Sequence, residues 1–181
     1  MAKIVFKCLQ CGRCCKDLIK ELEGGLSGFS FSPDEKNLFP NELISPNVGI
    51  GWGMPGGPKY VTAYQLNVGT CPNLSKGNLC SIHDKRPLTC QAFPLIPTGS
   101  GGTAIAEPDH CAFVEEVERK LGSLNSILPV TPKKFIAPKE WQAIAKINSW
   151  ATKSVAAHPM DTQVLWVFDL KDKEWQIWSA V

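Results

Sequence analysis

The sequence predicts an α+β fold: a small mixed domain with a loop-borne cysteine cluster and a C-terminal helix plus β-hairpin extension. Three observations support this prediction. Short segments with alternating apolar residues share the chain with segments of helical spacing. The cysteines lie in stretches rich in glycine and proline, which are typical of loops. The last part of the chain contains an amphipathic segment followed by two aromatic-rich runs around a charged turn.

The first predicted elements lie just after the N-terminal cysteines. Residues 16–25 carry leucines at helical spacing before a Gly-Gly pair, which predicts a short helix that ends there. Residues 28–31 alternate and predict a short strand. Ser32 as N-cap, Pro33 at the first helical position and Glu35 closing a capping box predict the start of a helix.

The middle of the chain is predicted to hold a long loop and three strands. Residues 45–59 are rich in glycine and proline and predict a loop. Residues 60–68 follow as a predicted strand that leads to Cys71. Residues 93–110 resemble two short strands around a glycine-rich turn.

Two helices and a hairpin are predicted in the C-terminal part. Asp109 is expected to cap a helix of about a dozen residues that ends at Gly122. Its expected buried face consists of Val114, Val117 and Leu121. Pro138 opens the second helix, whose apolar face should contain Trp141, Ile144, Ile147 and Ala151. Residues 164–180 predict two strands around a charged turn.

The length of 181 residues fits one globular domain in two regions. We expect residues 1–113 to form a cysteine-cluster, metal-binding region and residues 114–181 to form a helical and hairpin extension packed on it. The formal charge of +2 does not by itself argue for a nucleic-acid partner. Five of the six tryptophans occur from Trp141 onward; they indicate either core positions or a surface for a protein or RNA partner in the C-terminal region.

The sequence predicts a cytoplasmic protein with no membrane association. The N-terminus has an apolar run of only three residues before Lys7, far shorter than the core of a signal peptide, and no segment approaches the length of a membrane span. Thiols are kept reduced in the cytosol. Eight cysteines in that compartment therefore favour metal ligation over disulfides.

The spacing of the cysteines predicts a metal centre. The candidate ligands are Cys8, Cys11, Cys14, Cys15, Cys71, Cys80, Cys90 and Cys111. The first three form C-x2-C-x2-C, the run that supplies three ligands to one cluster in bacterial-type ferredoxins. Neighbouring side chains diverge along an extended chain or a helix, so Cys14 and Cys15 do not easily chelate one ion. Cys15 is expected to serve a second centre, to bridge two metals or to support the site from outside.

The local setting of some cysteines predicts their chemistry. If Cys14 and Cys15 open a helix, its positive end lowers the pKa of their thiols, and the same argument applies to Cys111. The alternative for a single cysteine is a small buried apolar residue, which is most plausible for Cys111. Eight thiols are enough for two four-ligand sites, and spacing does not reveal the grouping.

The segments "FKCLQCGRCCK" and "CPNLSKGNLCSIHDKRPLTCQAFPL", with the further Cys111, resemble the CxxCxxCC cysteine-cluster family. This family, also called YkgJ-like, is described as zinc- or iron-chelating, and its relatives include flagellin lysine N-methylases. The resemblance covers about residues 5–113 and includes Arg86-Pro87 and Phe93-Pro94. It implies a metal or iron–sulfur centre held by these cysteines and does not settle a reaction. Tyrosine is common in the family where this chain has His83, and the segment between Cys15 and Ser32 is longer than usual.

Other residues are weaker candidates. His83 is either a ligand in a mixed cysteine–histidine site or a supporting residue, and the family's tyrosine favours support. Arg86 either donates hydrogen bonds to cluster sulfurs or fixes a turn through a salt bridge. His110 is expected at a helix start and His158 on the surface. No arrangement typical of a catalytic triad, paired carboxylates or a nucleotide-binding fingerprint is visible, so catalytic residues and enzyme activity stay open.

Two hypotheses from different classes follow. The first is a cytoplasmic protein that holds an iron–sulfur cluster, 4Fe-4S by preference, for electron transfer or support of a modification reaction. The alternative is a structural zinc-binding module that mediates protein or RNA interaction. The ferredoxin-like triple spacing favours iron, although four-cysteine zinc sites are common.

Overall fold

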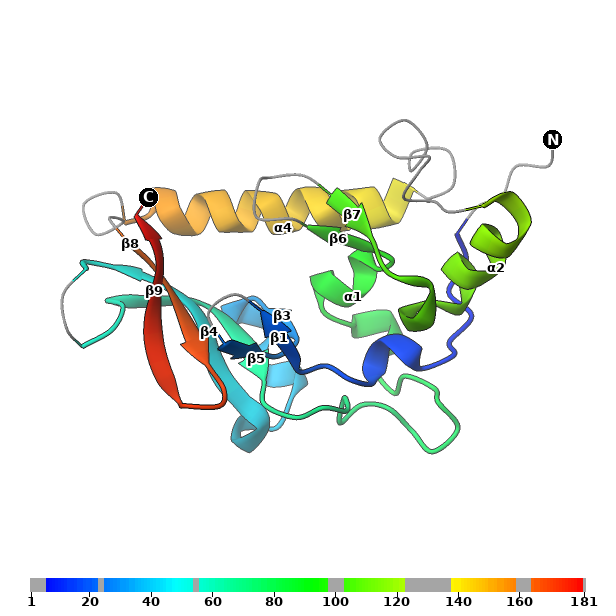
Figure 1. Ribbon diagram of the computed structural model, residues 1–181, viewed down its shortest axis with the longest axis horizontal. Coiled ribbons are helices and arrows are strands. Elements are labelled where there is room, and N and C mark those ends of the chain that lie inside the picture. Colours follow the sequence, from blue (N-terminus) through cyan, green and yellow to red (C-terminus); the bar gives the residue numbers. More distant parts are fainter. Residues whose placement is uncertain are drawn as a thin grey trace. The chain divides into compact units, whose positions relative to one another are not determined.

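The structure is a computed structural model that describes residues 6–22, 25–53, 56–97, 103–122, 138–158 and 164–180 (Figure 1). Over these residues it confirms the predicted α+β class, with helices, a five-stranded antiparallel sheet and two small two-stranded sheets. The chain divides into two compact units. Unit 1 comprises residues 1–15 and 74–148, and unit 2 comprises residues 16–73 and 149–181. The domain division predicted at residue 113 stays a prediction.

Unit 2 is built on the five-stranded sheet. Its strands, in spatial order, are β3 (Ser30–Phe31), β5 (Tyr60–Leu66), β4 (Ile44–Gly51), β8 (Val164–Asp169) and β9 (Glu174–Ala180). The predicted C-terminal hairpin is confirmed as β8 paired with β9, with Asp169 opposite Glu174. The predicted strands at 28–31 and 60–68 correspond to β3 and β5.

The prediction of a loop over residues 45–59 is wrong for its first half, which forms strand β4. The glycines there mark close approach of another backbone segment. A Cβ atom on Gly49 would lie 2.5 Å from the Cβ of Pro58, and one on Gly51 would lie 2.6 Å from the amide nitrogen of Lys59. Glycine in a strand allows such an approach, and the returning chain is hidden from a local reading of composition.

The helix predicted over residues 16–25 is also wrong. Strand β1 (Lys20–Leu22) pairs antiparallel with β2 (Gly25–Ser27), and residues 23 and 24 lie outside the described chain. The amide of Leu26 donates to Oδ1 of Asp169 at 2.9 Å, and the amide of Leu170 donates to the carbonyl of Leu26 at 2.9 Å. A ten-residue helix is marginal in water, so these bonds from a distant segment decide in favour of the strand.

Gln65 ties the strands of unit 2 together from a fully buried position. Its Nε2 donates to the carbonyls of Pro46 at 2.7 Å and Phe168 at 3.1 Å. Its Oε1 accepts from the amide of Gly28 at 2.6 Å and from Oγ of Ser27 at 3.2 Å. One side chain thereby satisfies polar groups on several segments that would otherwise be buried without partners.

The apolar core of unit 2 lies beside short 3₁₀ helices. Phe31, Phe39 and Leu66 are its buried centre. Helix η2 (Pro33–Leu38) starts as predicted, because Glu35 accepts a hydrogen bond from the Ser32 amide at 3.0 Å. A further 3₁₀ turn, η3 (Asn41–Leu43), leads into β4.

Apart from residues 138–148, which belong to a long helix described below, the described part of unit 1 consists of short elements. They are η1 (Arg13–Cys15), η4 (His83–Lys85), α1 (Leu88–Ala92), β6 (Leu95–Pro97), β7 (Thr103–Ile105), η5 (Pro108–His110) and α2 (Ala112–Leu121). The two strands predicted within residues 93–110 are confirmed as the β6–β7 pair, and their turn at 98–102 lies outside the described residues.

Helix α2 begins later than predicted. Asp109 lies in the 3₁₀ turn η5, and Cys111 takes the N-cap position. The predicted face is confirmed at Val114 and Val117, which are buried, and the helix ends at Gly122 with φ of +85°. The side chain of Leu121 is outside the described set.

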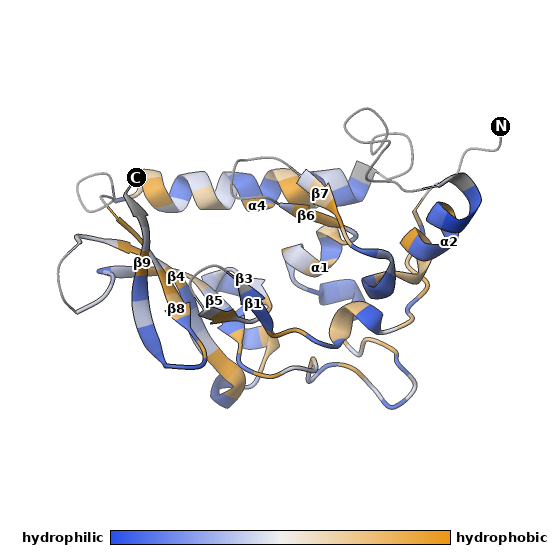
Figure 2. Ribbon diagram, viewed as in Figure 1, coloured by the Kyte–Doolittle hydropathy of each residue, from blue (hydrophilic) through white to orange (hydrophobic). Residues whose placement is uncertain are grey.

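Helix α4 (Pro138–Ala156) begins at the predicted proline. Blue and orange alternate along it in Figure 2, as expected for a helix with one apolar face. Ile144 and Ile147 are buried as predicted, whereas Ala151 is exposed. Its residues up to Asn148 belong to unit 1 and those from Ser149 to unit 2. No helix within the described ranges is long and apolar enough to cross a membrane.

Replacing Gln65 by leucine should lower the free energy of unfolding by about 3 kcal/mol, because the partly buried carbonyls of Pro46 and Phe168 and the amide of Gly28 lose their partner. Urea denaturation measures this loss. Thr62→Val on the same strand removes a single 3.3 Å bond to Val48 and serves as the control. Equal destabilisation by the two variants would contradict the assigned role of Gln65.

Candidate metal centre

Seven of the eight cysteines line one cavity of about 70 Å³ within unit 1. They are Cys8, Cys11, Cys14, Cys15, Cys80, Cys90 and Cys111. Cys111 is buried and the others are half-buried, and none of the eight cysteines of the chain forms a disulfide. The cavity therefore brings together thiols from four separate stretches of sequence.

The N-terminal run reaches the cavity through a tight turn at Gly12. Gly12 has φ of +72° and Gln10 has φ of +48°. The Cys15 amide donates to the carbonyl of Gly12 at 3.1 Å, which closes the 3₁₀ turn η1. A Cβ on Gly12 would lie 2.9 Å from the Cβ of Asn78. Glycine is needed here for its conformation and for its lack of a side chain.

Cys14 and Cys15 both line the cavity although they are adjacent. They lie in the three-residue turn η1, and the following residues are not helical. The expectation that these two residues open a following helix is therefore wrong. A 3₁₀ turn still lets neighbouring side chains approach the same space from different directions.

The second stretch is the loop that carries Cys80. Cys80 forms an isolated antiparallel bridge with Leu74. Within the loop that this bridge closes, the amide of Ser75 donates to the carbonyl of Leu79 at 2.9 Å, and Oγ of Ser75 accepts from the amide of Leu79 at 3.1 Å. Asn78 has φ of +60°, as asparagine tolerates. This closed loop packs against Gly12 and holds Cys80 at the cavity.

Cys90 and Cys111 come from the two helices α1 and α2. Cys90 is the third residue of α1, and Cys111 is the N-cap of α2. Burial raises the pKa of the Cys111 thiol, although the amides of Val114 and Phe113 lower it. The expected lowering by the helix start is present and is outweighed by desolvation.

Two histidines and an arginine also line the cavity. Nη1 of Arg86 lies 2.9 Å from Nδ1 and 2.8 Å from Nε2 of His83. Burial, and then the neighbouring Arg86 charge, lower the pKa of His83, so its neutral form is favoured. His110 lies 2.8 Å from the carboxylate of Asp109. His158 lies in unit 2, where its ring stacks on Tyr60.

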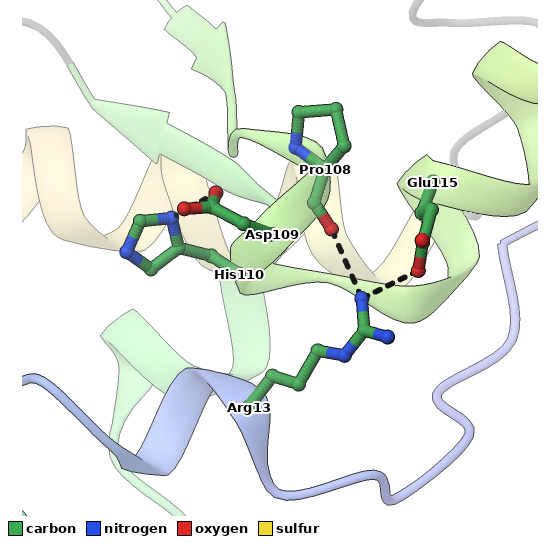
Figure 3. Close-up of polar contacts among 5 residues, drawn as sticks. All are labelled: Arg13, Pro108, Asp109, His110 and Glu115. Atoms are coloured by element: carbon green, nitrogen blue, oxygen red, sulfur yellow. Dashed lines mark hydrogen bonds and ion pairs between the residues drawn. The ribbon is translucent and has the colours of Figure 1, made fainter.

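Arg13 links the N-terminal turn to the segment around Cys111 (Figure 3). Its Nη1 donates to Oε2 of Glu115 at 2.6 Å and to the carbonyl of Pro108 at 3.3 Å. The Glu115 carboxylate raises the pKa of the guanidinium, which stays cationic. Arg13 stands between Cys11 and Cys14 in sequence, so this contact fixes their turn against η5 and α2.

Cys71 is the one candidate ligand in unit 2. It is half-buried and packs against the cluster of Phe31, Phe39 and Leu66. This is the setting of a small apolar side chain, so its predicted ligation has no local support and stays a prediction.

Within the described part of the chain, no three His, Cys, Asp or Glu side chains converge closely enough to chelate a single ion as they stand. The seven thiols share a cavity wall.

Some features of this site had no clear sequence signal. Phe6, Phe93 and Phe113 form part of the wall, and the rings of Phe6 and Phe113 meet edge to face at 5.0 Å. Asn78 and the Arg13–Glu115 pair were also missed, because the positive φ and a partner 102 residues away are not local patterns. Gly12, between Cys11 and Cys14, is the local residue that permits the turn.

Gly12→Ala should reduce metal retention several-fold, because the added Cβ meets Asn78 and the backbone favours glycine. Metal per chain after purification, measured by elemental analysis, tests this. Gly77→Ala is the matched control, since its nearest atom would be Oγ of Ser75 at 3.9 Å. Full metal content in the Gly12→Ala protein would show that the site does not require glycine at this position.

Arg13→Ala should speed the loss of metal to a competing chelator, because the turn that carries Cys11 and Cys14 loses its tie to Pro108 and Glu115. The transfer rate is followed by absorbance of the chelator complex. Arg119→Ala removes the same charge from an exposed position of α2. If both variants lose metal at the same rate, the faster loss results from the missing positive charge and not from the missing contacts of Arg13 with Pro108 and Glu115.

The comparisons with known proteins agree with this site. The model of the CxxCxxCC family, described as a putative zinc- or iron-chelating domain, matches residues 7–112. No curated protein and no solved structure matches the chain. The matched range contains all eight cysteines and more than half of the sequence. The resemblance seen in the cysteine spacing is thereby confirmed: the chain belongs to the CxxCxxCC family.

Proposed function

We propose that the cysteine cavity of unit 1 holds an iron–sulfur cluster, 4Fe-4S by preference, that serves electron transfer or supports a modification reaction. Cys8, Cys11 and Cys14 would anchor it, and Cys80, Cys90 and Cys111 would complete it. Cys15 would bridge or serve a second metal. The observation that carries the proposal is the gathering of seven thiols on one cavity.

The number of thiols favours a polynuclear centre. A structural zinc ion takes four ligands in a tetrahedral arrangement. Seven thiols on one cavity exceed that number by three. A cluster with several metal atoms has more positions to which thiolates bind, and the adjacent pair Cys14 and Cys15 can then serve different atoms of one centre.

The size of the cavity also supports a multi-atom occupant. A single water molecule needs about 10–15 Å³ of such space. The cavity offers about 70 Å³, several times that amount.

The surroundings suit redox chemistry. A cluster of this kind supplies one-electron transfer, with a potential that depends on burial and on hydrogen bonds to sulfur. Phe6, Phe93 and Phe113 exclude water from part of the wall, and Arg86 brings a guanidinium to it. These residues would adjust the charge balance of the bound centre.

A zinc module is the second candidate. The specific observation in its favour is that His83 and His110 line the cavity beside the cysteines, since mixed cysteine–histidine sets are common for zinc. The lowered pKa of His83 favours the neutral ring that a metal requires.

Anaerobic purification separates the two candidates. Iron–sulfur protein should be brown, absorb near ~400 nm and contain iron with acid-labile sulfide. Colourless protein that contains zinc alone would refute the cluster and support the zinc module. Reductive titration followed by electron paramagnetic resonance then tests the redox role.

Single serine variants locate the ligands. Cys11→Ser and Cys90→Ser should each remove most of the bound iron, because a thiolate ligand is lost. Cys71→Ser is the internal control for unit 2. Full iron content in Cys71→Ser protein would restrict the ligand set to the seven thiols of unit 1, and loss of iron would extend it to Cys71.

A further inference from the structure

A second cavity, of about 520 Å³, lies in unit 2 and is separate from the cysteine residues. Strand β5 and the residue before it contribute Lys59, Tyr60 and Tyr64, and the C-terminal end of α4 contributes Lys153. His158 completes this side just after the helix. The volume is within the range of small-molecule sites, about 300–1,000 Å³.

The charged side chains at this cavity are of one sign. Lys59 and Lys153 line it, and none of the described lining residues is acidic. A third ammonium is close by, because Nζ of Lys36 lies 4.2 Å from the ring centre of Tyr64. Like charges on one concave surface repel each other, and an anion that binds between them relieves this repulsion.

The C-terminal end of helix α4 offsets the positive charge of these lysines only in part. A helix C-terminus acts as roughly half a negative charge, confined to its last turn. Lys153 lies in that turn and offsets it. The end of α4 therefore adds little negative charge beside the two lysines that line the cavity.

The cavity wall is held in place by ring contacts. Tyr60 and His158 stack with ring centres 3.8 Å apart and planes inclined by 16°. Nζ of Lys59 lies 5.5 Å from the Tyr60 ring centre, and the Lys59 amide donates to the carbonyl of Ile50 at 2.9 Å. A wall that is ordered before binding loses less entropy when a ligand arrives.

We propose that this cavity binds a phosphorylated small molecule. The phosphate takes its place between the ammonium groups of Lys59 and Lys153, and the aromatic rings provide apolar surface for the organic part. Lysine is a common phosphate-binding residue, and its hydrogen bonds to phosphate are charge-assisted. The site belongs to unit 2 and is independent of the metal proposed for unit 1.

Isothermal titration of the metal-loaded full chain at low salt tests the proposal. The probes are adenosine monophosphate, ribose 5-phosphate and inorganic phosphate. We expect both organic phosphates to bind with Kd below about 1 mM and more tightly than inorganic phosphate. If adenosine monophosphate binds more tightly than ribose 5-phosphate, the aromatic rings of the cavity contact the planar base. If the two bind equally, the cavity recognises the phosphate and the sugar.

Two variants and a control connect binding to the cavity. Lys153→Ala should weaken binding about fivefold, as expected for one exposed charge, and Lys59→Glu combined with Lys153→Glu should abolish it. Lys146→Ala on the same helix is the control, because Lys146 is exposed and does not line the cavity. The single alanine variant changes an exposed helix position and should fold normally.

Three results would overturn the proposal. They are no binding of either organic phosphate, binding that the Lys153→Ala and double-glutamate proteins retain in full, and much tighter binding of a ten-nucleotide RNA than of any monophosphate. The last result would identify a nucleic-acid surface instead. In each case the metal content of unit 1 is unaffected, so failure here is distinguishable from failure of the metal proposal.

Discussion

The left-handed turn at Gly12 is the constraint on which the cysteine cavity depends. Cys11 and Cys14 reach the same space only if the chain reverses between them, and Gly12 permits this at φ of +72°. The loop that holds Cys80 packs so closely on Gly12 that a methyl group would meet Asn78. Contact between these two segments, rather than attraction between thiols, therefore brings Cys11, Cys14 and Cys80 to the same cavity.

The same packing also affects the protonation of the Cys111 thiol. Burial raises the pKa of the Cys111 thiol, so without a positive partner this group keeps its proton. Metals bind thiolates, and binding releases the protons that the thiols carried. Thiolates gathered at one cavity repel each other. A cationic centre offsets that repulsion, with Arg86 as the nearby protein charge.

Local sequence patterns predicted what depends on neighbouring residues. The capping box at Ser32, the β8–β9 hairpin and the start of α4 at Pro138 follow from a few adjacent side chains. The spacing of the cysteines predicted a metal centre but not how the cysteines group, and the structure places seven of them around one cavity. Strands β1 and β4 were missed because their support comes from other segments: Asp169 bonds the β1–β2 pair at Leu26, and β4 pairs with β5 and with the distant β8.

The two units differ in what stabilises them. Unit 2 has a continuous sheet, an aromatic core and the fully bonded Gln65. The described part of unit 1 that surrounds the cavity consists of elements such as the five-residue α1 and the three-residue β6 and β7, and such short pieces gain little stability alone. Val114 and Val117 of α2 give it some apolar core. Any centre held by thiols from its separate segments crosslinks them, so in this unit metal binding and folding are expected to be coupled.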